Sequence, residues 1–206
     1  HSYLRLSYDI MRRRDSLLSE NTGWRHYPVS LEASWNGKRT DLKISFRVTY
    51  SSACPCSAAL SRQTLKERFE EDFSDHQAIS LSHVANWLQT REATSSVPHS
   101  QRSHADLTVV AEKADEGLLE DLIDQVEETL GTAVQAAVKR EDEQEFAALN
   151  GANLMFCEDA ARRICSLLDE DKGFRDYRIE VRHMESLHPH DAVAITTKGV
   201  EGGLRP

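Results

Sequence analysis

The most reactive side chains in the sequence lie in residues 51–63, where Cys54 and Cys56 flank a single proline. This C-x-C spacing differs from the C-x-x-C pairs of zinc knuckles and thioredoxin-like redox centres. A thiolate at this position is suited to metal binding or nucleophilic chemistry. Taken alone, the motif is equally consistent with a structural turn whose two thiols are inert.

Three further polar clusters contain residue types that carry chemistry. They are the His-Ser-Gln-Arg-Ser-His run at 99–104, the Lys-Arg-Glu-Asp-Glu run at 139–143 with Phe-Cys-Glu-Asp at 156–159, and Glu-Ser-Leu-His-Pro-His at 185–190. Each has a plain alternative. An acidic run is usually a solvated helix face, His-Pro-His fits a tight turn, and a helical Cys157 fits a core position. No single cluster therefore identifies a site.

In combination the clusters are more informative. One thiolate, one imidazole and one carboxylate form a ligand set suited to zinc, manganese or ferrous iron. Three protein ligands leave a position open for water, which is the arrangement of catalytic rather than structural metal sites. Two additional histidines fit the roles of general acid and general base. The spacing along the chain does not determine whether these groups converge.

The elements that must position these residues begin with a hairpin. Residues 27–35 alternate between apolar and polar side chains, residues 42–48 alternate back, and Asn36-Gly37 lies between them. Asn-Gly is the preferred two-residue turn of antiparallel hairpins. The hairpin therefore has one buried face and leads the chain directly to Cys54.

The remaining segments predict helices and strands in an α+β order. We expect a helix over residues 3–19, helices within 58–92 with a break near 73–75, a loop at 93–98 and a strand at 106–112. Helices are predicted over 118–130 and 153–168, and closing strands over 177–181 and 193–197. This order indicates an antiparallel sheet with helices on one face.

Composition excludes several classes of protein. The 206 residues carry a formal net charge of −9, which argues against nonspecific nucleic-acid binding. No apolar run approaches the roughly 18 residues that span a bilayer, so no membrane partner is expected. Four cysteines are too few for a disulfide scaffold, and with no export signal visible they predict a reduced, cytoplasmic protein.

The five motifs together, in this order, resemble GTP cyclohydrolase of type IB. They are Cys-Pro-Cys-Ser at 54–57, His-Ser-Gln-Arg-Ser at 99–103, Lys-Arg-Glu-Asp-Glu at 139–143, Asn-Leu-Met-Phe-Cys-Glu-Asp-Ala-Ala-Arg at 153–162 and Glu-Ser-Leu-His-Pro-His at 185–190. Gly-Trp-Arg-His-Tyr-Pro-Val at 23–29 also matches. The resemblance therefore runs from the first predicted element to about residue 198.

This resemblance implies a tunnelling fold, in which antiparallel sheets are backed by helix pairs and assemble into a homotetramer with active sites at subunit interfaces. It also implies the reaction. GTP and water yield formate and 7,8-dihydroneopterin triphosphate, the first step of tetrahydrofolate biosynthesis. A divalent ion at such a site lowers the pKa of water toward about 7.

By the same resemblance, each site residue has an expected role. Cys54, His99 and Glu143 match the metal ligands, and Cys56 matches a thiol near the reacting centre. Glu158 matches the glutamate that anchors guanine, and His188 and His190 match the paired catalytic histidines. Gln101, Arg102, Ser103 and Lys139 are the expected substrate-binding residues, with the basic ones placed for the triphosphate.

The sequence departs from the family pattern in two places. Residues 60–97 form an inserted helical segment where many relatives have a short loop. The family's N-terminal portion, with its Gly-Ile-His-Met-Ser-Arg-like segment, has no counterpart here. The chain is otherwise expected to be a single catalytic domain over residues 1–206.

Two other functions remain open at this point. The first is an NADPH-dependent 7-cyano-7-deazaguanine reductase of the same fold, which uses a cysteine nucleophile and no metal. The second is a noncatalytic purine-binding relative. The combined Cys, His and Glu set favours the cyclohydrolase.

Overall fold

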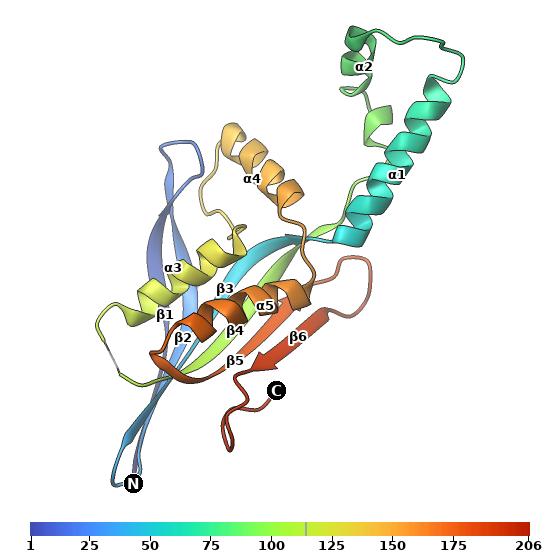
Figure 1. Ribbon diagram of the computed structural model, residues 1–206. Coiled ribbons are helices and arrows are strands. Elements are labelled where there is room, and N and C mark those ends of the chain that lie inside the picture. The colour runs from blue at the N-terminus through green and yellow to red at the C-terminus, as the bar shows by residue number, and fades with distance from the viewer. Residues whose placement is uncertain (114) are drawn as a thin grey trace.

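Six antiparallel strands form one sheet in which spatial order equals chain order, from β1 to β6 (Figure 1). The computed structural model describes residues 1–113 and 115–206. The strands are β1 Ser2–Asp15, β2 Thr22–Trp35, β3 Thr40–Ala53, β4 Ser100–Ala111, β5 Phe174–His183 and β6 Ala192–Thr197. The helices are α1 Pro55–Asp72, α2 Leu81–Trp87, a 3-10 turn at Glu92–Thr94, α3 Leu118–Leu130, α4 Arg140–Ala152 and α5 Cys157–Glu170. The predicted α+β class with an antiparallel sheet is confirmed.

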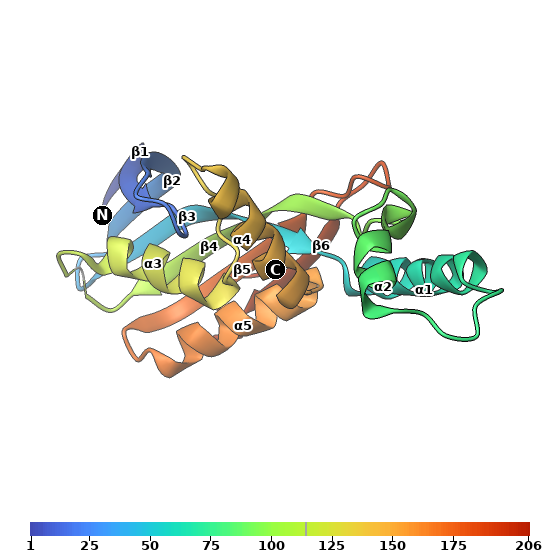
Figure 2. The same cartoon turned by 90° about the horizontal axis from the view of Figure 1, so that it is seen from above.

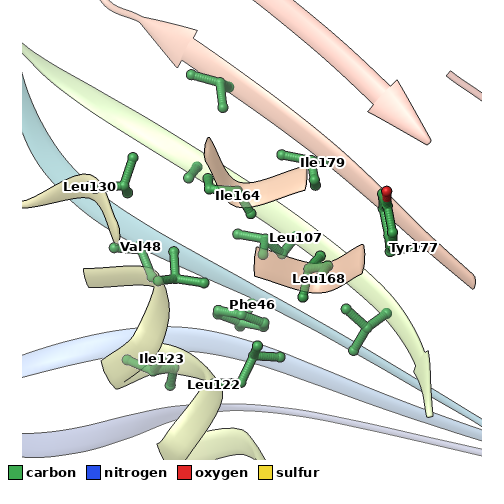
Figure 3. Packing of buried hydrophobic residues seen from close by; sticks show 14 of the residues in the cluster. Phe46, Val48, Leu107, Leu122, Ile123, Leu130, Ile164, Leu168, Tyr177 and Ile179 are labelled. Carbon is green, nitrogen blue, oxygen red and sulfur yellow. The ribbon is translucent and has the colours of Figure 1, made fainter. Parts of the chain in front are cut away.

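The core lies between one face of the sheet and two amphipathic helices, α3 and α5, which lie across it (Figures 1 and 2). Alternate residues of β3, β4 and β5 face these helices and are buried, as period-two patterning requires. Phe46, Leu107 and Ile179 of the sheet pack against Ile123 and Ile164 of the helices (Figure 3). The predicted helices at 118–130 and 153–168 are confirmed, the second beginning four residues later.

The N-terminal segment is a strand, so the helix predicted for residues 3–19 is wrong. β1 pairs with β2 along its whole length, from Ser2 opposite Trp35 to Asp15 opposite Thr22. Arg12 and Arg14 bind acids of α3, with Arg12 2.9 Å from Asp124 and Arg14 3.1 Å from Glu127. These ion pairs join residues more than 100 positions apart, so local periodicity carries no sign of them.

The predicted hairpin is confirmed, with its turn centred one residue later than expected. The Asn36 backbone N–H donates to the Arg39 carbonyl oxygen at 3.2 Å, which leaves Gly37 and Lys38 at the tip. Gly37 has a φ of +94°, a conformation that glycine adopts without steric cost.

The segment between β3 and β4 is a helical arm that projects away from the sheet (Figures 1 and 2). α1 and α2 confirm the helices predicted within 58–92, and the 3-10 turn extends two residues into the predicted loop at 93–98. The arm has a small aromatic core in which Phe73 and Trp87 are buried. The Trp87 indole N–H donates to Asp72 at 2.9 Å, which joins α2 to the end of α1.

α4 is the one long helix that the sequence analysis missed. Its first turn contains the acidic run, of which Glu141 and Glu143 are exposed and Asp142 is fully buried. The Asp142 carboxylate accepts from the backbone N–H groups of Leu18, Ser19 and Lys139 at 2.8–2.9 Å. Burial acts to raise the pKa of Asp142, but these hydrogen bonds outweigh it and hold that pKa well below its usual range. An acidic residue at the third position of a helix, here Asp142, is typical of a helix N-terminus and could have predicted α4.

No helix in the described part of the chain is long and apolar enough to cross a membrane.

Candidate functional site

Three neighbouring strands, β3, β4 and β5, bring several of the expected residues together at one end of the sheet. β3 ends at Ala53, β4 begins at Ser100 and β5 ends at His183, and antiparallel pairing places these ends side by side. The N-terminus of α5 is held at the same end of the strands, because the Met155 N–H donates to the Ala53 carbonyl at 3.2 Å.

Cys54 and His99 form the first residue pair beyond the end of the β3–β4 ladder. The Cys54 N–H donates to the His99 carbonyl at 3.3 Å. Cys54 is the N-cap of α1, and Pro55 at the first helical position starts that helix with its fixed φ. The Ser57 hydroxyl then accepts from the His99 N–H at 3.0 Å, which holds the two segments together. Both side chains are half-buried.

Gln101 and Glu185 extend this arrangement from His99. The Gln101 amide Nε2 donates to Glu185 Oε1 at 2.8 Å, and Gln101 Oε1 lies 3.1 Å from His99 Nδ1. Glu185 Oε2 is 3.7 Å from the same ring nitrogen. Both polar ends of the Gln101 amide thus make contacts within the chain, and its expected role in substrate binding stays a prediction.

Glu143 does not complete a metal-binding group with Cys54 and His99 in the part of the chain that the structure describes. It is exposed and lines a cavity of about 600 Å³ between α1 and α4, together with Phe146 and Ser100. Within residues 1–113 and 115–206, no three His, Cys, Asp or Glu side chains lie close enough to hold a metal ion. The donor types suit a borderline-soft divalent ion, but one chain in this conformation places two of the three expected ligands together.

The remaining expected substrate-binding residues are divided between the two faces of β4. Ser103 is fully buried under the helices, where its hydroxyl is 2.7 Å from that of Ser52, so it has no surface with which to contact a substrate. Arg102 points to the other face and lines a cavity of about 480 Å³ with Arg47 and His104. Lys139 is exposed at the start of α4.

Glu158 is exposed in the first turn of α5, beside a buried thiol. Its own backbone N–H and the Cys157 thiol, which donates at 3.3 Å, hold the pKa of Glu158 below its usual range. Burial and this carboxylate raise the pKa of Cys157 to about 11. Cys157 is therefore a core thiol, as predicted, and Glu158 offers an ionised acceptor at the surface.

The loop between β5 and β6 carries His188 and His190 on either side of Pro189. Their rings are stacked, with centroids 5.2 Å apart and an interplanar angle of 12°. Both are exposed, as is Cys56 in the first turn of α1. Their positions leave all three accessible to a bound molecule.

The sequence analysis missed a buried polar pair, Tyr50 and His183, near the same ends of β3 and β5. The Tyr50 hydroxyl is 2.8 Å from His183 Nε2, and both residues are almost fully buried. Burial raises the pKa of Tyr50 and lowers that of His183 to about 4, against the attraction of Glu185 and Glu158. Both side chains are therefore neutral at pH 7.

This pair predicts a pH-dependent stability. As pH falls from 6.5 to about 4, His183 takes up a proton in the unfolded chain but not in the folded one, so the folded state loses stability. Between pH 7 and 4.5 this contribution amounts to about 2 kcal/mol. Urea unfolding at the two pH values checks it, with His183→Gln as the comparison. An equal loss of stability in the wild type and the variant would contradict this assignment.

A model of the type I GTP cyclohydrolase folE2 family matches residues 1–194. GTP cyclohydrolase FolE2 from Hydrogenovibrio crunogenus is 48% identical over 203 residues, covering 98% of this chain and 65% of the relative. The FolE2 protein of Pseudoalteromonas translucida is 48% identical, with 98% and 67% covered. That of Pseudomonas putida KT2440 is 53% identical, with 93% and 60% covered.

The chain thus spans about two thirds of the length of these curated relatives, or slightly less. Among solved structures, uricase from Arthrobacter globiformis aligns with 99% of this chain and 65% of its own, at a TM-score of 0.46 and 6% identity.

Proposed function

The chain belongs to the type I GTP cyclohydrolase folE2 family, and from that membership we propose that it converts GTP and water to 7,8-dihydroneopterin triphosphate and formate. The observation that carries the proposal is the family match over residues 1–194. The adjacency of Cys54 and His99 supports it, as does the attachment of the N-terminus of α5, which carries Glu158, at the same end of the strands. The reaction would serve as the first step of tetrahydrofolate biosynthesis.

Two parallel assays test this proposal. In the first, the protein is incubated with GTP and a divalent metal ion, and pterin fluorescence is read after oxidation. In the second, NADPH absorbance is followed with 7-cyano-7-deazaguanine. We expect pterin formation and no NADPH consumption. Consumption of NADPH would assign the chain to the reductase function, and binding of GTP without turnover would assign it to a noncatalytic role.

Guanine recognition is assigned to Glu158. Guanine presents two adjacent donors, N1–H and the 2-amino group, and an ionised carboxylate accepts both in a bidentate pair. Glu158 is exposed and its pKa is held below its usual range, so it is in the required charge state. Arg102 and Lys139 are assigned to the triphosphate because both are exposed cations.

Proton transfer is assigned to His188 and His190. Opening of the guanine imidazole ring at C8 requires addition of water and delivery of a proton to a ring nitrogen. Histidine performs this transfer near neutral pH. The two rings lie together in an exposed loop whose first residues contact the site through Glu185. Cys56, exposed in the first turn of α1, is assigned as the additional thiol.

We further propose that Cys54, His99 and Glu143 hold one divalent ion, zinc, manganese or iron. The adjacency of Cys54 and His99 and the chemistry of the three donors support this set. Glu143 lines the cavity whose wall includes Ala53 and Ser100, the chain neighbours of Cys54 and His99. Because the described residues contain no group of three donors close enough to hold an ion, a shift of α4 or a second copy of the chain would have to complete the set.

This ligand set predicts different outcomes for the two neighbouring thiols. Cys54→Ala should lose bound metal and activity together, whereas Cys56→Ala should keep the metal and lose rate. Neighbouring thiols in C-x-C rarely both reach one ion in a three-ligand site that keeps a position for water. Metal analysis of both purified variants checks this, and equal metal loss in both would contradict the assignment.

We also propose, from the family membership, that the chain assembles into a homotetramer of the tunnelling-fold type. The edge strand β1 is 14 residues long and presents exposed apolar side chains, including Tyr3, Leu4 and Leu6. Long apolar edges of this kind favour pairing with another chain. A cytoplasmic location is proposed because all four cysteines are free thiols.

A further inference from the structure

Three side chains from two separate segments form a continuous hydrogen-bonded chain that ends on His99. Glu185 Oε1 accepts from Gln101 Nε2 at 2.8 Å, and Gln101 Oε1 lies 3.1 Å from His99 Nδ1. Gln101 is 8% exposed and the Glu185 side chain 13% exposed, so solvent has little access to these contacts.

The sheet register holds this chain of contacts in place. His99 directly precedes β4 and Gln101 is two residues further on, so extended backbone places both side chains on the same side of the chain. Ser103 pairs with His183 across β4 and β5, and the Met184 N–H continues the pairing by donating to the Arg102 carbonyl at 3.2 Å. Glu185 therefore begins its loop beside Gln101.

The chemistry of the three groups fixes the direction of each hydrogen bond. A carboxylate only accepts, so the amide of Gln101 must turn its NH₂ toward Glu185. This leaves the amide oxygen facing His99, and an amide oxygen also only accepts. His99 Nδ1 must then carry the proton. A neutral imidazole has one N–H, so Nε2 holds the lone pair.

We propose that Glu185 is a positioning residue which, through Gln101, fixes His99 in the Nδ1–H tautomer. In water the opposite tautomer, with the proton on Nε2, predominates for free histidine. The relay thus keeps Nε2 as an electron-pair donor. Its use rests on the proposed function, where His99 is a metal ligand, and such ligands commonly donate their other N–H to a polar partner. The tautomer itself does not depend on that function.

Long-range ¹H–¹⁵N correlation spectra of histidine-labelled, metal-free protein at neutral pH test the proposal directly. The His99 signals are assigned by their loss in His99→Asn. We expect the wild type to show a protonated Nδ1 and an unprotonated Nε2. In Glu185→Ala, the Gln101 amide is free to rotate, and the Nε2–H form of His99 should become dominant.

Two further variants make the test specific. Gln101→Leu removes the intermediate group and should produce the same tautomer change, so the test stands if Glu185→Ala does not fold. Ser186→Ala, at an exposed neighbouring position in the same loop, should leave the tautomer unchanged. A wild-type His99 protonated at Nε2, or an unchanged tautomer in both Glu185→Ala and Gln101→Leu, would overturn the proposal. Because neither metal nor GTP is present, this outcome is independent of whether the protein turns over GTP.

Discussion

Replacing His190 with asparagine should lower GTP turnover by roughly 10²- to 10⁴-fold, the usual contribution of a positioned acid or base. Asparagine keeps a polar side chain of similar reach but cannot take up or release a proton near neutral pH. GTP binding and metal content should stay close to those of the wild type, because His190 is exposed and is not one of the residues assigned to the metal or to guanine. Steady-state kinetics with a parallel binding titration measure the split.

His188→Asn and His99→Asn are the comparison variants for this prediction. If His188 and His190 were both ligands in addition to Cys54, His99 and Glu143, five protein groups would leave no room for water and substrate. We therefore expect His99→Asn to lose the metal and the two loop variants to retain it. Loss of metal in either loop variant, with a filled site in His99→Asn, would show that the ligand histidine has been misassigned.

Glu158→Gln should weaken GTP binding by roughly 30- to 150-fold, with little change in metal content. The carboxylate accepts both N–H groups of guanine, whereas an amide offers one acceptor and turns its own N–H toward the other donor. Loss of a hydrogen bond to a charged group costs about 2–3 kcal/mol, which gives that range of affinity. Isothermal titration with GTP measures the effect.

Glu170→Gln, at the exposed far end of the same helix, is the matched control. It removes the same charge from α5 and should leave GTP affinity unchanged. A Glu158→Gln protein that binds GTP normally but carries no metal would instead identify Glu158 as a metal ligand and exclude Glu143 from that role.

The parts of the fold that follow local rules were predictable from the sequence. The alternation in residues 27–35 and 42–48 identified the β2–β3 hairpin, and the amphipathic patterns identified α3 and α5. β1 was misread because its apolar residues also recur at helical spacing, as at Leu4, Tyr8 and Met11, whereas the strand is fixed by its pairing with β2. α4 was missed because its acidic first turn resembles a solvated surface run, while Asp142 is buried by contacts with residues 18 and 19.

The candidate site was predictable in residue type but not in arrangement. The motif order identified Cys54 and His99, which the strand register places together. The same register separates Arg102 from Ser103 on opposite faces of β4, although they are consecutive in the motif. The roles of Gln101 and Glu185 emerged only from a contact that spans 84 positions in the chain.

The most direct test of the proposed activity follows the carbon atom that the reaction removes. GTP labelled with ¹³C at C8 is incubated with the protein and a divalent metal ion, and the label is followed by ¹³C NMR. Our account predicts that the label appears in formate in an amount equal to the GTP consumed, with unlabelled dihydroneopterin triphosphate as the other product. Folded, metal-loaded protein that binds the labelled GTP while the label stays in the purine ring would contradict it.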